Sequence, residues 1–391
     1  MSLTGPVFLD GVIALTVAAF VAVVVLWPRL TRRTPWHVAG RATALLIVNV
    51  MVLLTAATQL NATYLFFASW ADLHGALTGH QAQTSLDRGG VASRTPDLAA
   101  AGQAAPVATD PQPPPSPPAG PDGLTPYVVH GSASGLTGTV LVQLPPGYSS
   151  SSAGTRYPVL EALHGYPSEP LNWIQVFDLP RVIDQEAGAQ HLRAPLLVMP
   201  EVEIPRGVDT EGVNGPAGQP QVETWLTQDV PAWLGRHFRV IADRDAWATI
   251  GYSAGGFDAA MAAVLHPAQY GAGIVLGGYF RPEFGPFYDP FRADSPLGRR
   301  YDLVRAVADR PPPVALWLET SHADHLSYRS SAQFLRAVRA PTAVHAVILQ
   351  NAGHRDSVWI GLLPAALRWL GQDVRGFSPG AVSPPPAAPR R

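Results

Sequence analysis

The stretch Trp247-Ala-Thr-Ile-Gly-Tyr-Ser-Ala-Gly-Gly256 decides the fold class of this chain. A short apolar run leads into Gly251-Tyr-Ser-Ala-Gly255, and an Ala-rich segment of helical character follows at 257–265. A serine on a sharp strand-to-helix turn needs small residues two positions before and after it, because the backbone closes tightly there. The first amides of the helix then point at the serine, where they can stabilise an oxyanion. The stretch predicts a nucleophile elbow with Ser253 as the nucleophile.

Strand-like and helix-like runs alternate on both sides of this elbow. Such alternation is typical of an α/β domain with a mostly parallel sheet and helices on both faces. The expected strands are 139–144, 158–163, 195–199, 273–276, 314–318 and 344–349, and the expected helices are 222–238, 327–338 and 357–370.

A serine becomes a nucleophile at neutral pH only with a base, and the base needs an acid that fixes its tautomer. In this fold the chain order is serine, acid, histidine, which makes His354 the expected base. Asp324 lies in the loop after the strand at 314–318 and is the expected acid. Glu319 at the end of that strand is the alternative, and Asp356 is a more remote one.

The oxyanion hole is expected to combine two backbone amides, one from Ala254 and one from the loop after the strand at 158–163. In that loop, His164-Gly-Tyr166, the expected donor is the amide of Tyr166. Trp173 and Tyr279 are expected to shape the substrate pocket.

Composition excludes several classes of function. The net charge of −2 gives no basic surface for nucleic acid. With no cysteine, the chain has no disulfide, thiolate metal site or cysteine nucleophile. His322 and His325 flank Asp324, but one loop supplies too few ligands for a metal ion. We therefore expect neither a metal nor another cofactor.

Two apolar segments near the N-terminus, at about 11–27 and 42–60, are long enough to predict transmembrane helices. The loop between them is basic, and its arginines are Arg29, Arg32, Arg33 and Arg41. The positive-inside rule then places this loop in the cytoplasm and both chain ends outside. A signal peptide and a buried soluble hairpin are the alternatives.

These observations divide the chain into four parts. We expect residues 1–83 to form a membrane anchor, 84–123 a Pro-rich extracytoplasmic linker, 124–375 an α/β-hydrolase catalytic domain and 376–391 a disordered Pro-rich tail. The stretch Asp110-Pro-Gln-Pro-Pro-Pro-Ser-Pro-Pro is too rich in proline for a helix or sheet and is typical of an extended spacer.

Residues 127–370 resemble the putative esterase family, the α/β-hydrolase branch that includes esterase D and the antigen 85 mycolyltransferases. The resemblance rests on five motifs: His164-Gly-Tyr166, Asp229-Val-Pro-Ala-Trp233, the elbow, His266-Pro267 and Gly353-His354. Many members carry Met where Ala254 stands. Membrane-tethered versions of this domain are typical of actinobacteria, whose usage of arginine this chain shares.

The resemblance implies a serine hydrolase or acyltransferase that works through an acyl-enzyme on Ser253. The leading expectation is a membrane-anchored, extracytoplasmic serine esterase acting on an ester or lipid-like small molecule in the cell envelope. An acyltransferase that moves acyl groups onto envelope sugars or lipids, in the manner of the mycolyltransferases, is the first alternative. A non-catalytic envelope-binding module is the second.

Overall fold

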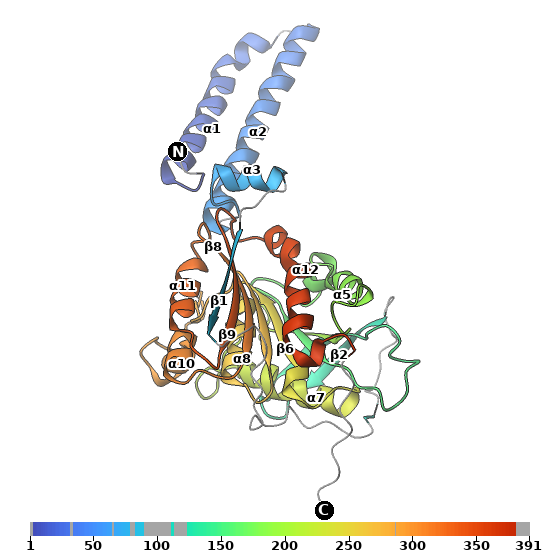
Figure 1. Cartoon of the computed structure of the whole chain (residues 1–391). Helices are drawn as coiled ribbons and strands as arrows, with labels where there is room; N and C mark the ends of the chain where they lie inside the picture. The colour runs from blue at the N-terminus through green and yellow to red at the C-terminus, as the bar shows by residue number, and fades with distance from the viewer. Residues whose placement is uncertain are drawn as a thin grey trace, which may run out of the picture. The chain divides into compact units, whose positions relative to one another are not determined.

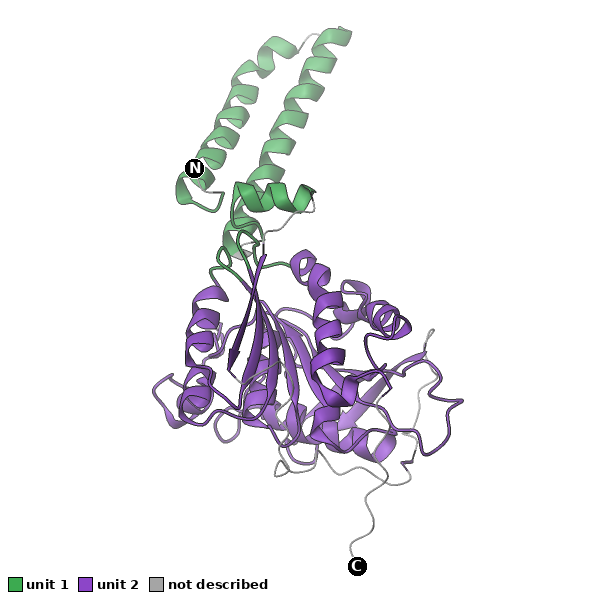
Figure 2. Cartoon of the chain, viewed as in Figure 1, with its two compact units in different colours: residues 1–82, 321–325, 349–355 green, residues 83–320, 326–348, 356–391 purple. Residues whose placement is uncertain are grey.

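The computed structural model describes residues 3–31, 34–64, 66–78, 83–89, 111–112, 123–285 and 287–380. The chain divides into two compact units, drawn in green and purple in Figure 2. Unit 1 contains residues 1–82, 321–325 and 349–355, and unit 2 contains residues 83–320, 326–348 and 356–391. The predicted triad is therefore divided, because Ser253 belongs to unit 2 and both Asp324 and His354 belong to unit 1.

Two long apolar helices dominate unit 1. Helix α1 spans Pro6–Leu26 and helix α2 spans Pro35–Tyr64, and a short helix α3 follows at Trp70–Thr78. The hydroxyls of Thr16 and Thr55 lie 2.7 Å apart and join α1 to α2 by a hydrogen bond. Both long helices are long and apolar enough to cross a membrane, and only 6% of each apolar window is buried. The alternative of a buried soluble hairpin does not fit such exposed apolar helices.

A nine-stranded sheet forms the centre of unit 2, with strand order β1-β9-β8-β7-β6-β4-β5-β3-β2. Its strands are β1 (Gln83–Gly89), β2 (Leu124–His130), β3 (Thr137–Gln143), β4 (Val159–Leu163), β5 (Leu196–Pro200), β6 (Trp247–Tyr252), β7 (Ala272–Leu276), β8 (Ala315–Ser321) and β9 (Ala343–Leu349). Strands β5, β4, β6, β7 and β8 run parallel, whereas β3 pairs antiparallel with both β5 and β2.

The parallel strands are short, apolar and buried along their whole length, as a sheet covered on both faces requires. Figure 1 shows α10 and α11 on one side of the strands and α5 and α12 on the other. The helices named below are α5 (Leu179–Gly188), α7 (Val230–His237), α8 (Ala254–Leu265), α10 (Leu303–Asp309), α11 (Tyr328–Ala337) and α12 (Asp356–Asp373). The predicted mostly parallel α/β architecture is confirmed.

Two expectations about the elements need correction. The expected linker at 84–123 begins with β1, a strand at the edge of the sheet, where the Asp87 carboxylate lies 2.7 Å from His345 Nδ1 on β9. The expected helix at 222–238 is interrupted by a π-helical turn at Trp225–Asp229. Pro231 explains the interruption, because proline lacks the N–H that a regular helix needs at that position.

Most of the remaining Pro-rich linker, and residues 381–391 of the expected tail, lie outside the described residues. The described part of the tail, residues 376–380, includes the end of a 3₁₀ turn at Arg375–Phe377. The domain boundaries stay predictions.

Candidate active site

Ser253 occupies the turn between β6 and α8 in a strained backbone conformation, with φ of 56° and ψ of −124°. A non-glycine residue adopts a positive φ of this kind only where its surroundings enforce it. The enforcing contacts include a hydrogen bond from the Ser253 N–H to the Leu276 carbonyl, 2.9 Å long. Helix α8 begins at Ala254, so the Ala254 amide is one of the N-terminal amides that have no carbonyl partner within the helix.

Two glycines make this turn possible. A methyl group on Gly251 would lie 1.8 Å from the carbonyl oxygen of Gly255, and one on Gly255 would lie 2.2 Å from the carbonyl oxygen of Leu163. Both separations are far below van der Waals contact, so neither position accepts a side chain without a backbone shift. The small residues that the elbow pattern requires thus have a direct steric cause.

The loop His164-Gly-Tyr166 after β4 lies against the elbow. A methyl group on Gly165 would lie 3.1 Å from Ser253 Cβ, so glycine allows the loop to approach this closely. His164 holds the loop through both ring nitrogens: Nδ1 donates to the Gly165 carbonyl at 2.9 Å, and Nε2 accepts from the Val202 N–H at 3.1 Å. Burial lowers the pKa of His164 to about 4, so this ring is neutral and braces the loop.

Ala254 and Tyr166, the two residues expected to form the oxyanion hole, line one cavity in unit 2. Its volume of about 10 Å³ is room for about one water molecule. The polar loop after β5 and the first turns of α8 complete the wall. The remaining lining residues are His164, Gly165, Val202, Glu203, Asp209, Thr210, Glu211, Gly212 and Asp258.

Three carboxyl groups of this wall have raised pKa values. Burial raises the pKa of Asp209 to about 6, and it raises the pKa of Glu211 and of Asp258 well above the usual range. The Tyr279 hydroxyl donates a hydrogen bond to Glu211. Neither carboxyl oxygen of Asp258 has a hydrogen-bond partner among the described residues. Burial therefore favours the neutral form of the Glu211 and Asp258 carboxyls.

Sequence reasoning did not identify these three carboxyls as a group. The sequence pointed only to the polar loop after β5, which contains Asp209 and Glu211. Such a loop can contact a ligand, because ligands of parallel sheets bind beyond the carboxyl ends of the strands. Asp258 gave no signal, because it lies inside an otherwise apolar helix.

The two residues expected to shape the pocket are buried and do not line this cavity. Trp173 packs on Tyr252, the residue before the proposed nucleophile, with ring centroids 5.1 Å apart. Tyr279 stacks on Phe257 of α8, with ring centroids 5.9 Å apart. Trp173 thus packs against the last residue of β6, and Tyr279 packs against helix α8, the two elements that the elbow joins.

In unit 1, His354 and Asp324 are hydrogen-bonded to each other. His354 Nδ1 lies 2.9 Å from the Asp324 Oδ2 atom, and both side chains are largely buried. Their loops are joined where the His322 N–H donates to the Leu349 carbonyl at 2.9 Å. A carboxylate at Nδ1 leaves Nε2 as the nitrogen that can accept a proton.

Glu319, the alternative acid, has a different partner. Its Oε2 atom accepts a hydrogen bond from the Gly277 N–H at 2.9 Å, and its side chain is buried. This contact holds the turn after β7. The geometry therefore favours Asp324 over Glu319 as the partner of His354.

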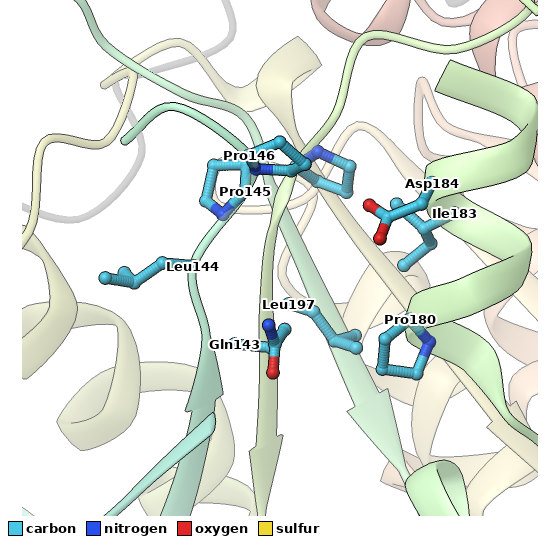
Figure 3. Close-up of a pocket in the computed structure, with 9 residues that line it drawn as sticks. Gln143, Leu144, Pro145, Pro146, Pro180, Ile183, Asp184 and Leu197 are labelled. Atoms are coloured by element: carbon cyan, nitrogen blue, oxygen red, sulfur yellow. The ribbon is translucent and has the colours of Figure 1, made fainter. Parts of the chain in front are cut away.

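A larger cavity of about 190 Å³ lies elsewhere in unit 2, between the end of β3 and the start of β5 (Figure 3). It is lined by Gln143, Leu144, Pro145, Pro146, Pro180, Ile183, Asp184, Pro195 and Leu197. Asp184 is the titratable residue in this lining, and no serine, threonine or histidine accompanies it there. The cavity lies at the start of β5, whereas the elbow follows the end of the parallel strand β6. This cavity carries no argument for catalysis.

The chain is similar to known proteins in sequence and in fold. An uncharacterized protein of Corynebacterium glutamicum is 24% identical over 251 residues, which cover 58% of this chain and 55% of that protein. An esterase of Mycobacterium tuberculosis is 29% identical over 225 residues, covering 50% of this chain and 47% of that protein. The chain thus spans about half the length of the curated relatives it matches.

The structure is similar to that of a ferulic acid esterase, with a TM-score of 0.55 and 18% sequence identity. The match covers 64% of this chain and 98% of that one. This likeness confirms the predicted α/β-hydrolase fold. Residues 133–370, more than half of the chain, match the family described as "Putative esterase". The chain therefore belongs to the putative esterase family.

Proposed function

We propose that this chain is a serine esterase that hydrolyses carboxylic esters through an acyl-enzyme on Ser253. The observation that carries the proposal is the strained Ser253 turn, which is followed by Ala254, a residue that lines the same cavity as Tyr166. Strain of this kind persists at functional sites, where it exposes a reacting atom.

In the proposed mechanism, Ser253 Oγ attacks the ester carbonyl while His354 Nε2 takes the hydroxyl proton. The amides of Ala254 and Tyr166 hold the tetrahedral oxyanion. As the intermediate collapses, His354 returns the proton to the departing alcohol, which leaves an acyl group on Ser253. Water then attacks this acyl group, His354 takes and returns a proton again, and the carboxylic acid departs. Asp324 holds the His354 ring in the tautomer that both steps require.

We further propose that α1 and α2 anchor the protein in a membrane with the esterase domain outside the cytoplasm. A helix of 21 residues is about 31 Å long, which matches a hydrocarbon core of about 30 Å. The Thr16–Thr55 hydrogen bond is the kind of polar contact that joins helices in lipid. Arg29 between the two helices and Arg41 near the start of α2 favour a cytoplasmic location for the turn that joins the helices.

The catalytic proposal is tested with a fluorophosphonate probe on the full chain in detergent micelles. We expect labelling of the wild type and none of Ser253→Ala; equal labelling of both would refute the nucleophile. An unlabelled but folded wild type would favour the non-catalytic binding module. A panel of p-nitrophenyl esters of increasing chain length, with and without sugar acceptors, then separates hydrolysis from acyl transfer.

The topology is tested with reporter fusions after Leu9, within residues 29–41 and after Asp122. We expect a cytoplasmic signal only from the middle fusion. A cytoplasmic signal from the fusion after Asp122 would contradict the proposed location of the esterase domain.

A further inference from the structure

The residue after His354 is anchored by an unusually complete set of contacts within unit 1. Arg355 forms a bidentate ion pair with Asp72, in which Nη1 lies 2.7 Å from Oδ2 and Nη2 lies 2.7 Å from Oδ1. The same Nη1 donates to the Phe66 carbonyl at 2.7 Å, and the guanidinium lies 4.8 Å from the centroid of the Phe67 ring. The side chain of Arg355 is 8% exposed and that of Asp72 is fully buried.

Asp72 is itself fixed in place. Its Oδ2 atom also accepts the Ala68 N–H at 3.0 Å, and its own N–H donates to the Ser69 hydroxyl at 3.1 Å. Residues 66–72, which we call the clamp segment, thus surround one guanidinium with a carboxylate, a carbonyl and an aromatic face. The clamp segment begins two residues after the end of α2.

These contacts fix the backbone on one side of His354. A planar guanidinium held by a bidentate carboxylate and a carbonyl has one orientation, unlike a lysine held as a point charge. Arg355 is joined to His354 by a peptide bond, and α12 begins at the next residue, Asp356. On its side-chain face His354 is held by Asp324 at 2.9 Å. The ring is therefore positioned by two independent contacts, one on its side chain and one on its backbone.

We propose that Asp72 and Arg355 are positioning residues for the proposed base, so that turnover depends on the segment that follows the second apolar helix. This inference rests on the proposed function, because it assigns His354 the role of base. Neither Asp72 nor Arg355 lines the cavity at Ala254. The clamp therefore acts on the proton-transfer geometry and leaves substrate binding unchanged.

The experiment compares Asp72→Asn, Arg355→Met and the double variant with the wild type, all as the full chain in detergent micelles. Asp309→Asn is the matched control, since it neutralises the partner of Arg305 in an exposed pair. We expect the Asp72 variant and the double variant to lower kcat at least tenfold, with KM within twofold of the wild type. The control should change neither constant.

The double variant separates positioning from mere stability. It removes both charges together, so no unpaired charge stays buried, and we expect its thermal midpoint to return towards that of the wild type. Its kcat should remain low, because methionine cannot bridge the clamp segment. A double variant with wild-type kcat would overturn the proposal, even if Asp72→Asn alone fails to fold.

A chemical readout keeps the test independent of esterase activity. Diethyl pyrocarbonate modification of His354, followed by mass spectrometry, should be at least fivefold faster in the double variant and unchanged in the Asp309 control. An unchanged rate in the double variant would show that the clamp does not position the ring. Failure of the proposed function has a different signature, namely a wild type that fluorophosphonate does not label.

Discussion

Glu161 makes the stability of this fold depend on pH in a direction that can be calculated. It lies on β4 in the middle of the sheet, is fully buried, and accepts a hydrogen bond from the Tyr270 hydroxyl at 2.6 Å. Its other carboxyl oxygen has no hydrogen-bond partner among the described residues. Burial raises the pKa of Glu161 from 4.5 to about 8, although the hydrogen bond from Tyr270 works against the increase.

The sign follows from which state binds the proton. Between pH 4.5 and about 8 the folded protein keeps Glu161 protonated, whereas the unfolded chain loses that proton. Each pH unit in this window lowers the free energy of unfolding by about 1.4 kcal/mol, so the whole window is worth about 5 kcal/mol. The contribution of Glu161 is fully present below pH 4.5 and is lost as the pH rises through about 8.

Glu161→Gln removes this titration and keeps an oxygen that can accept the Tyr270 hydroxyl. We expect the stability of the variant relative to the wild type to increase by about 4 kcal/mol between about pH 5 and about pH 9. Urea unfolding of the full chain, followed by tryptophan fluorescence, measures this difference. Glu169→Gln, at a side chain that is 46% exposed, is the control and should show no such trend. Parallel pH profiles for Glu161→Gln and the wild type would refute the reasoning.

Four further predictions concern the elbow, helix α12, the proposed acid and the cavity wall. Gly251→Ala should abolish fluorophosphonate labelling and destabilise the fold by about 1–3 kcal/mol, because its methyl group would lie 1.8 Å from a carbonyl oxygen. Gly361→Ala, with open space around an exposed helical glycine, should stabilise the fold by about 0.5–1 kcal/mol, and urea unfolding of both glycine variants measures the two changes. Asp324→Asn should lower kcat by about 10⁴-fold, whereas Glu319→Gln, which can still accept its amide partner, should change kcat less than about threefold; the reverse ranking would make Glu319 the acid. Because Asp209 ionises with a pKa of about 6, its charge should oppose an oxyanion above that pH. The kcat of Asp209→Asn relative to the wild type should therefore rise by about tenfold from pH 5 to pH 7.5, and a flat ratio would contradict the placement of the oxyanion.

The central strands could be predicted from sequence because burial on both faces makes them continuous apolar runs. Strands β4, β5 and β7 were expected within one or two residues of their observed bounds for this reason. Strand β1 could not be predicted, since Gln83–Gly89 is largely polar and mostly exposed at the edge of the sheet. Its place depends on pairing with β9, more than 250 residues away in sequence, and local pattern carries no information about such pairing.

The candidate site likewise contains residues that the sequence predicts and residues that it does not. Ser253, Ala254 and Tyr166 are marked by local requirements of the backbone, namely glycines at fixed spacing and a strand before a helix. The ion pair between Asp72 and Arg355 joins positions 283 residues apart and has no periodicity or motif. The carboxyls of Asp209, Glu211 and Asp258 could not be predicted as a group for another reason. Their pKa values are raised by burial, which exists only in the folded chain.

Burial of Glu211 and Asp258 reduces an apparent conflict in the proposed mechanism. If the amide of Ala254 holds an oxyanion, negative charge develops in a cavity whose wall also contains Glu211 and Asp258. Ionised carboxylates there would repel the transition state and cancel the benefit of the helix amides. Because burial raises both pKa values well above the usual range, the neutral form of both groups is favoured, and a neutral carboxyl adds no opposing charge. The same desolvation that disfavours a permanent anion also strengthens the hydrogen bonds of the amides to a transient one. An acidic wall and an oxyanion hole are therefore compatible where burial keeps the wall carboxyls protonated, and Asp209, with a pKa of about 6, is the carboxyl of this wall that ionises near neutral pH.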